Sequence, residues 1–267
     1  VFRMILNSEQ ESFRASVGSF LAAKLPISAL RTLRGKPVAT AYDRDLWGQL
    51  ARLGVSSITV PAASGGAEFG WLALGAVAQE VGRRLSPTPL LSSVVLAQGA
   101  LIQCASPAQV ARYLPALLNG DEVWAVAFEE EAHFSPDRLQ TAMTPQGLCG
   151  SKGMVLDGAA ADRLLVTALD GSGQWGLLLV DPDTPGITLR ASRLMDRPQY
   201  VAFEFSEVSE LACEWVAGPA SEGAWARVLN QAMAVLAAEM LGSARELCER
   251  TIEYLKEREQ FDVKIGS

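Results

Sequence analysis

Hydrophobic residues repeat at helical spacing over roughly the first 120 positions. Ser8 and Glu11 have the spacing of a capping box, which predicts a helix start. Gly54 and Gly82 predict helix ends, and Pro107 predicts a first helical turn. Together these signals predict an all-helical N-terminal domain over residues 1–122. The apolar residues expected on its buried helix faces are Phe13, Val17, Phe20, Leu21, Trp47, Leu50, Leu53, Trp71, Leu74, Val77, Ala78 and Val81.

Between residues 123 and 219 the apolar spacing changes to that of β-strands. Val201, Phe203 and Phe205 alternate with small or polar residues, which is typical of a strand with one solvent-facing side. Turn sequences such as Asp157-Gly158 and Pro185-Gly186 separate the runs. The runs expected as strands are residues 123–128, 153–156, 164–167, 175–180, 187–189 and 201–205. Several short strands at this spacing predict a small antiparallel sandwich or barrel as a middle domain.

Helical spacing returns after Pro219. Residues 221–258 contain no proline, and they predict one helix of about 35 residues and roughly 50 Å. A helix of this length needs helices to pack against, so residues 220–267 are predicted to begin a C-terminal helical bundle. The expected fold class is therefore α+β with several domains. If the rest of the bundle is absent, another chain must cover the apolar face of this helix.

Composition narrows the classes of function. The 267 residues are 49% hydrophobic and carry a net charge of −7, as expected for a globular protein that does not bind nucleic acid. A single histidine, His133, excludes most zinc sites and catalytic triads, so no metal is expected. Four dispersed cysteines predict reduced thiols, and no stretch has the length of a signal or membrane-spanning segment. We therefore expect a cytoplasmic protein.

Five short motifs occur in an order that resembles the acyl-CoA dehydrogenase family over essentially the whole chain. They are Leu53-Gly54 with Val60-Pro61 and Gly65-Gly66; Glu80-Val81-Gly82-Arg83 with Pro87 and Pro89; Gly150-Ser151-Lys152 with Ala161-Asp162; Leu165-Val166; and Tyr254 with Arg258, Gln260 and Phe261. The resemblance implies FAD between the middle and C-terminal domains. It also implies a glutamate that removes the α-proton of an acyl-CoA while the β-hydride passes to the flavin.

The same resemblance implies that subunits share the cofactor. It assigns Arg258, Gln260 and Phe261 to the FAD of a neighbouring subunit, where the arginine meets the pyrophosphate. The implied partners are an acyl-CoA thioester and homologous subunits in a homo- or heterotetramer.

Other positions depart from the family pattern. A Thr-Glu pair near the flavin reads Phe128-Glu129, and no Gly-Ser-Asp follows it. A Trp-Ile-Thr strand reads Met154-Val155-Leu156, so Phe128, Met154 and Leu156 are degenerate flavin-contact positions. In one branch of the family the base falls on Ala232, which cannot take a proton, and in the commoner branch it lies beyond Ser267. No catalytic residue is identified in this chain.

These departures favour one subunit of a heteromeric acyl-CoA dehydrogenase whose partner carries the complete flavin site. The family analogy further suggests a bulky substrate, such as a steroid side-chain thioester. One alternative is an inert structural subunit that keeps the fold and the oligomer interface without binding FAD or substrate in its own pocket. Another is a homomeric dehydrogenase whose base lies in the remaining bundle.

Several of these residues also have simpler interpretations. Arg258 has the spacing to pair with a glutamate on the helix surface. Residues 129–131 are expected to form a solvated acidic loop, with His133 as an exposed polar residue. Lys152 is expected in a turn against backbone carbonyls, and Trp71 and Trp225 are expected in the core.

Overall fold

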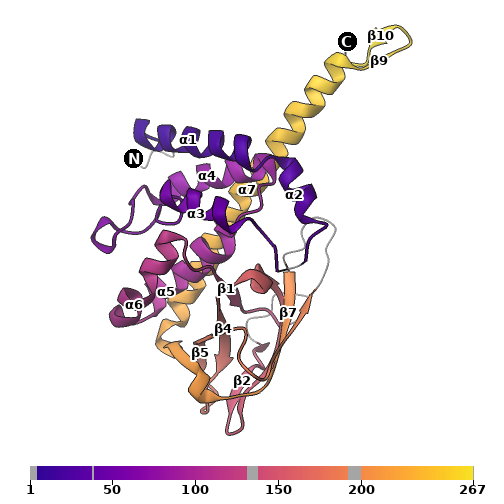
Figure 1. The fold of residues 1–267 in the computed structure, drawn as a ribbon. Helices are drawn as coiled ribbons and strands as arrows, with labels where there is room; N and C mark the ends of the chain where they lie inside the picture. The colour runs from indigo at the N-terminus through magenta and orange to yellow at the C-terminus, as the bar shows by residue number, and fades with distance from the viewer. Residues whose placement is uncertain (1–4, 38, 131–137, 192–199, 267) are drawn as a thin grey trace.

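The computed structural model describes residues 5–37, 39–130, 138–191 and 200–266, and it has the expected α+β class. A helical part lies against a twisted sheet, and a long C-terminal helix crosses both and extends beyond them (Figure 1). The helices are α1 (Ser8–Lys24), α2 (Ile27–Leu33), α3 (Arg44–Arg52), α4 (Gly70–Arg84), the π-helix η2 (Leu90–Ala97), α5 (Gln98–Cys104), α6 (Pro107–Asn119) and α7 (Glu222–Glu257). Four 3₁₀ turns are η1 (Ala62–Ser64), η4 (Gly158–Ala160), η5 (Glu210–Ala212) and η6 (Pro219–Ser221).

The first helix begins one residue earlier than the sequence predicted. Asn7, rather than Ser8, is the N-cap, and its side chain accepts a hydrogen bond from the backbone of Gln10 at 2.8 Å. The Gln10 side chain accepts in return from the backbone of Asn7 at 3.0 Å, so the capping box is Asn7/Gln10. Asn and Gln perform the same reciprocal bonding as the predicted Ser8 and Glu11, which is why the two registers compete in the sequence.

Most residues predicted on buried helix faces are buried, including Val17, Leu21, Leu50 and Leu74. Two predictions were wrong. Leu53 caps the C-terminal end of α3, where it is 42% exposed, and Trp71 lies in the first turn of α4, where it is 40% exposed.

The sheet is mixed and open rather than an antiparallel barrel. Its strands are β1 (Trp124–Ala127), β2 (Ala142–Thr144), β3 (Gly147–Leu156), β4 (Arg163–Leu169), β5 (Trp175–Val180), β6 (Ile187–Ala191), β7 (Tyr200–Val208) and β8 (Cys213–Ala217). They follow the order β6-β7-β3-β2-β4-β5-β8, and β1 pairs with β4. Two pairings, β1 with β4 and β2 with β4, are parallel, which corrects the predicted all-antiparallel arrangement. The ends of this order, β6 and β8, do not pair with each other, so the described strands do not close into a barrel.

The two faces of the sheet belong to two apolar clusters. Trp124, Val126 and Leu177 face a cluster that includes the N-terminal helices and the first half of α7. Phe203, Phe205 and Leu178 belong to a second cluster on the opposite face. The first cluster therefore joins all three segments of the chain, and the predicted domain boundaries at residues 122/123 and 219/220 stay predictions.

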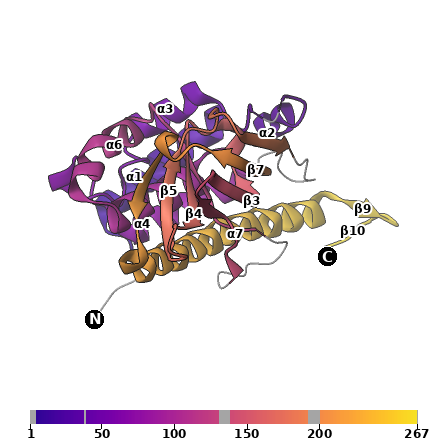
Figure 2. The ribbon, with the colours of Figure 1, turned by 90° about the horizontal axis from the view of Figure 1, so that it is seen from below.

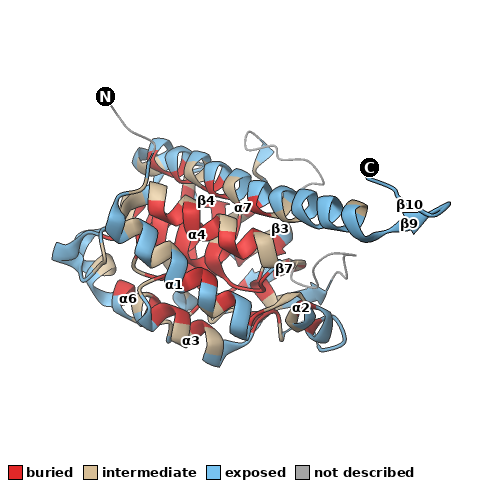
Figure 3. Ribbon diagram, turned by 90° about the horizontal axis from the view of Figure 1, so that it is seen from above, coloured by how far each residue is buried: buried red, intermediate tan, exposed pale blue. Residues whose placement is uncertain are grey.

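Helix α7 spans Glu222–Glu257, within one residue at each end of the predicted 221–258. It crosses α4 where two glycines face backbone: a Cβ on Gly82 would lie 1.9 Å from the Glu239 carbonyl oxygen, and one on Gly242 would lie 2.0 Å from that of Gln79. Beyond the crossing the helix is mostly exposed, as Figure 3 shows, and it ends in a small hairpin of β9 (Glu259–Gln260) and β10 (Val263–Lys264). Figure 2 shows this hairpin well outside the main body.

Candidate functional site

The three positions aligned with the family's flavin contacts lie at the ends of neighbouring strands. Phe128 follows β1, and Met154 and Leu156 close β3. The ring of Phe128 packs edge-on against Trp225 of α7, with ring centroids 5.7 Å apart. Trp225 is buried in the core, as predicted. Phe128 and Trp225 thus join the strand end to the start of the long helix through apolar contact.

These residues do not fit a hydrogen-bonded flavin ring. The polar edge of a flavin is held by donors, which tune its electronics as well as its position. Phe128, Met154 and Leu156 carry no such group, and Met154 is 42% exposed with a left-handed φ of 50°. The nearby Glu129 is half-buried, and burial raises the pKa of its carboxyl. At these three positions the strand ends can therefore make apolar contacts with a flavin, but no side chain there can form a hydrogen bond with it.

Ala232 lies on the inner face of α7 and is 8% exposed. Its methyl group belongs to the cluster shared by the helices and the sheet, so nothing at this position can remove a proton. Glu239, two turns further along α7, is the glutamate of this helix that is buried. No motif in the sequence indicated it.

A groove of about 440 Å³ opens beside Glu239, where α2 faces α7 and the ends of β3 and β7. Leu156 is one of its walls, so one predicted flavin-contact residue lines a cavity. Arg31 in the last turn of α2 and Arg34, the residue that caps its C-terminal end, are the signal through which the sequence could have indicated this groove. It is lined by Ile27, Leu30, Arg31, Arg34, Leu85, Leu91, Leu156, Tyr200, Leu236, Glu239, Met240 and Ser243.

Lys152 and Glu130 differ most from their sequence predictions. Lys152 lies within β3 and not in a turn, with its side chain fully buried. Its Nζ donates to Glu130 Oε1 at 2.8 Å and to Thr167 Oγ1 at 2.9 Å. Glu130 also accepts from the backbone of Gln140 at 2.7 Å and of Thr141 at 2.9 Å. Glu130 is therefore part of a buried ion pair rather than a solvated acidic loop.

Environment shifts the pKa of both partners. Burial lowers the pKa of Lys152 to about 8, although the carboxylate of Glu130 opposes this shift. For Glu130 burial acts to raise the pKa, but the hydrogen bonds from Lys152 and Thr141 outweigh it, and the net shift is downward. At neutral pH the pair is charged. Thr167 Oγ1 also donates to the Phe128 carbonyl at 3.5 Å, so the pair supports the strand end that carries Phe128.

Arg258, Gln260 and Phe261 lie far from these strand ends. All three are exposed at the outer end of α7 and on the hairpin that follows (Figure 1). The Gln260 side chain donates to the Glu259 carbonyl at 2.8 Å, and Phe261 is 96% exposed with a φ of 55°. Within this chain the structure does not bring these residues together with Phe128, Met154 or Leu156.

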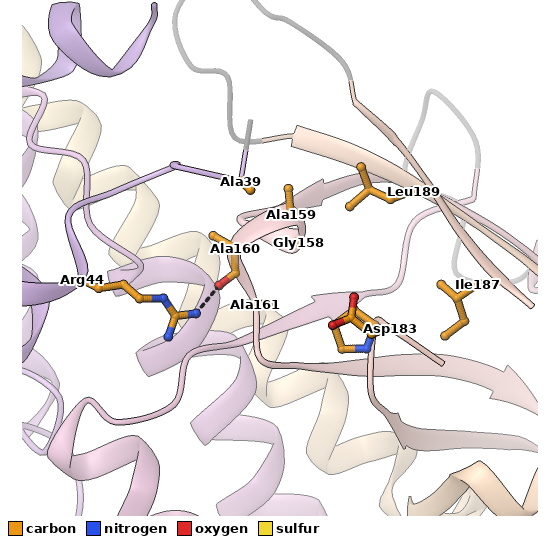
Figure 4. Close-up of a pocket in the computed structure, with 10 residues that line it drawn as sticks. Ala39, Arg44, Gly158, Ala159, Ala160, Ala161, Asp183, Ile187 and Leu189 are labelled. Carbon is orange, nitrogen blue, oxygen red and sulfur yellow. Dashed lines mark hydrogen bonds between the residues drawn. The ribbon is translucent and has the colours of Figure 1, made fainter. Parts of the chain in front are cut away.

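A second hollow, of about 460 Å³, lies where the segment before α3 meets η4 and the turn before β6 (Figure 4). Arg44 lines it, but its guanidinium already donates to the Ala160 carbonyl at 2.8 Å and pairs with Asp162 at 2.9 Å. These bonds join the helical part to the sheet, and none of the predicted site residues lines this hollow.

The remaining predictions concern two residues of the acidic loop, metal binding and membrane-spanning segments. Glu131 and His133 lie outside the described residues. Among the described residues, no group of three or more His, Cys, Asp or Glu side chains is placed to hold a metal ion. No helix in the described ranges has the length and apolarity needed to cross a membrane.

Comparisons with known proteins agree on one family. Residues 7–121 match the model of the acyl-CoA dehydrogenase N-terminal domain. Acyl-CoA dehydrogenase FadE27 of Mycobacterium tuberculosis is 33% identical over 85% of this chain and 60% of its own length. The chain therefore spans less than two thirds of this relative.

Solved structures extend the match to the fold of the whole chain. The ChsE4-ChsE5 complex from Mycobacterium tuberculosis is 28% identical, with a TM-score of 0.85 over 100% of this chain and 71% of that chain. A variant of the Tcur3481-Tcur3483 steroid ACAD is 28% identical, with a TM-score of 0.83 over 97% of this chain and 70% of that one. A glutaryl-CoA dehydrogenase of Mycobacterium smegmatis in complex with FADH2, 22% identical with a TM-score of 0.82 over 98% of this chain and 69% of its own, shares the fold. From motifs, fold and relatives together, this chain is a member of the acyl-CoA dehydrogenase family.

Proposed function

We propose that this chain is one subunit of a heteromeric acyl-CoA dehydrogenase that introduces an α,β double bond into an acyl-CoA thioester. A homologous partner subunit would hold most of the FAD, which would supply the hydride acceptor, and Arg258, Gln260 and Phe261 of this chain would contact it. The observation that carries the proposal is the contrast between two places in the chain. The three flavin-contact positions carry apolar side chains, whereas Arg258 and Gln260 keep their polar groups at an exposed tip.

The first half of the contrast concerns the chain's own strand ends. A flavin seated there would face Phe128 packed against Trp225, with no side-chain hydrogen bond from Met154 or Leu156. Ala232 supplies no base. We therefore assign no proton or hydride transfer to a residue of this chain.

The second half concerns the tip. An arginine on a rigid helix end can bind a phosphate through two parallel hydrogen bonds, and a nearby exposed aromatic ring can pack against a nucleotide. Arg258 follows the last turn of α7, and Phe261 lies on the hairpin beyond it. Both are exposed at this outer end of the chain, which suits contact with a cofactor on a neighbouring subunit.

Relatives support the partner and the substrate class. The name of one similar structure describes a complex of two proteins, and that of another describes a steroid ACAD. We propose a bulky substrate of that kind, a steroid side-chain CoA thioester. The inert-subunit alternative predicts no change in cofactor or substrate binding when residues of this chain are altered.

Substitution of Arg258 tests the proposal. The assembly is purified through a tag on this chain, and its bound flavin is released and measured against protein. Arg258→Gln is expected to lower the flavin content or to speed flavin loss on dilution about tenfold, because it removes one charge-assisted phosphate contact. Arg250→Gln, about two helical turns inside α7 and paired with Glu246, is the matched control. Unchanged flavin retention in Arg258→Gln would contradict the shared site.

A further inference from the structure

The two ends of the mixed sheet differ in how they are covered. At one end β8 lies against α6, whose Gln109 side chain donates to the Trp215 carbonyl at 3.0 Å and whose Tyr113 hydroxyl donates to Glu214. At the other end β6 pairs with β7, and four of the five residues of β6 are exposed, including Leu189 at 42%. An uncovered edge strand presents backbone groups to which a further strand can pair.

The register of β6 against β7 shows which backbone groups face this open edge. The Ser206 amide donates to the Gly186 carbonyl at 2.8 Å, just before β6 begins, and the ladder continues in the same register. Hydrogen-bonded and non-hydrogen-bonded pairs alternate along an antiparallel ladder, so every second residue of β6, beginning with Thr188, bonds to β7. The backbone N–H and C=O groups of Leu189 and Ala191 point instead to the open edge.

The sequence of β6 is complementary to a second copy of itself in this register. If two copies pair antiparallel about Leu189, each Leu189 lies opposite its counterpart and Ile187 lies opposite Ala191, so groups that face the open edge meet one another. The two Leu189 residues then exchange hydrogen bonds, and the Ala191 amide of each copy donates to the Ile187 carbonyl of the other. Arg190 lies opposite Thr188, so no two like charges face each other across the strands.

The side chains on one face of β6 favour the same pairing. Ile187 and Leu189 line the hollow of about 460 Å³ beside η4, together with Ala159 (Figure 4). Ile187 and Ala159 also pack against the apolar cluster that contains Phe203 and Phe205. A two-fold axis perpendicular to the sheet keeps these side chains on one face of both copies. Leu189 of the second copy therefore lies beside the first Leu189, and both lose contact with water.

We propose that β6 is a contact between two copies of this chain, in which the two β6 strands pair antiparallel about Leu189 and join their sheets into one. A contact of five residues a side is small for a stable dimer. It therefore orients two copies within an assembly that larger surfaces hold together. The contact involves neither flavin nor substrate, so it goes beyond the proposed function.

Disulfide trapping in the assembly purified through this chain tests the contact. Opposed residues of a hydrogen-bonded antiparallel pair have Cα atoms about 5.5 Å apart, within the range of about 4.4–6.8 Å for disulfides. Under mild oxidation, Leu189→Cys is expected to give a covalent dimer of this chain at least about tenfold faster than Leu211→Cys, because paired strands raise the effective concentration of the two thiols. Leu211 is 99% exposed on the η5 turn, so this control measures random collision, and wild type measures the native cysteines.

A second change tests the backbone hydrogen bonds. Ala191→Pro, added to Leu189→Cys, removes an amide that faces the open edge and leaves the bonds to β7 in place. We expect it to slow trapping about tenfold, whereas Ala191→Ser in the same background keeps the amide and should leave the rate unchanged. Melting temperatures of the two variants are compared, so that a slower rate is assigned to pairing only where the fold is retained.

The outcomes decide between the possible occupants of this edge. Equal trapping of Leu189→Cys and Leu211→Cys, or a rate that Ala191→Pro leaves unchanged, would overturn strand pairing. A disulfide from the Leu189→Cys variant to a different polypeptide, identified by mass, would overturn the second copy as the occupant. Flavin retention is measured separately, so each of these results leaves the test of Arg258 intact.

Discussion

The charges of Lys152 and Glu130 lie inside the protein, where an unpaired charge is costly. Their pair connects β3 to the backbone of Gln140 and Thr141. The sequence could not indicate this pair, because its partners are 22 residues apart and only the tertiary fold brings them into contact. Phe128 is the opposite case. A phenylalanine at the position where the family pattern has a threonine is enough to predict that a side-chain hydrogen bond to flavin is absent there.

Removal of one partner is expected to be strongly destabilising. Lys152→Met leaves the Glu130 carboxylate without its cation in a buried place, and we expect a loss of about 3–5 kcal/mol in the free energy of unfolding. Arg190→Met breaks the exposed pair with Glu204 on the same sheet and is expected to cost less than about 1 kcal/mol. Urea unfolding followed by circular dichroism compares the two. Similar small losses in both variants would show that the Lys152 pair is solvated.

The same pair predicts a dependence on acid. The pKa of Glu130 is below its ordinary value of 4.5, so the unfolded chain takes up this proton at higher pH than the folded chain. The stability that Glu130 contributes is present above about pH 4.5 and is lost as pH falls through its folded pKa. Between about pH 5.5 and 3, wild type should lose more stability than Glu130→Gln in urea unfolding at each pH. Parallel losses would contradict this assignment.

At the scale of elements, periodicity located the long helix and most strands well. Residues 175–180 are β5 as predicted, and α7 differs from its prediction by one residue at each end. The strands β2 and β8 were missed. The three residues of β2 are too few for alternation to be distinguished from a loop, and β8 does not alternate regularly, because three apolar residues, Trp215, Val216 and Ala217, follow one another at its end. The parallel pairing of β1 with β4 was also missed, since strand order depends on contacts between distant segments.

The crossing of α4 and α7 gives a prediction at this scale. Gly242→Ala would place a Cβ 2.0 Å from the Gln79 carbonyl oxygen, so the two helices must separate. We expect it to lower the unfolding free energy by about 2 kcal/mol or more. Gly223→Ala, in the same helix with no atom within 4 Å, is the control and should stabilise by up to about 1 kcal/mol. Thermal unfolding distinguishes them, and equal melting temperatures would contradict close packing at the crossing.

At the scale of the whole molecule, α7 carries a long exposed apolar surface. Met233, Met240 and Leu247 are each at least 60% exposed, and Leu241 lies beside them. An exposed apolar row of this kind is typical of a surface that packs against another protein segment or chain. The sequence predicted this surface from helix length alone, but only the structure shows which side of α7 is covered by α4.

We expect the isolated chain to self-associate through this surface. Replacing Met240 and Leu247 by lysine should reduce association, because it interrupts the apolar row with two charges. Light scattering across a range of concentrations measures this. The exposed pair Glu253→Lys with Glu257→Lys on the same helix controls for added positive charge and should leave association unchanged. A monodisperse wild-type monomer at all concentrations would contradict the prediction.

The division of one flavin site between two polypeptides is tested most directly by the flavin content and mass of the intact assembly. Native mass spectrometry would give its subunit composition, and absorbance at about 450 nm would give the amount of bound flavin. We expect a complex with a homologous subunit and about one flavin for every two polypeptides. A homo-oligomer of this chain alone with one flavin in each subunit would contradict it.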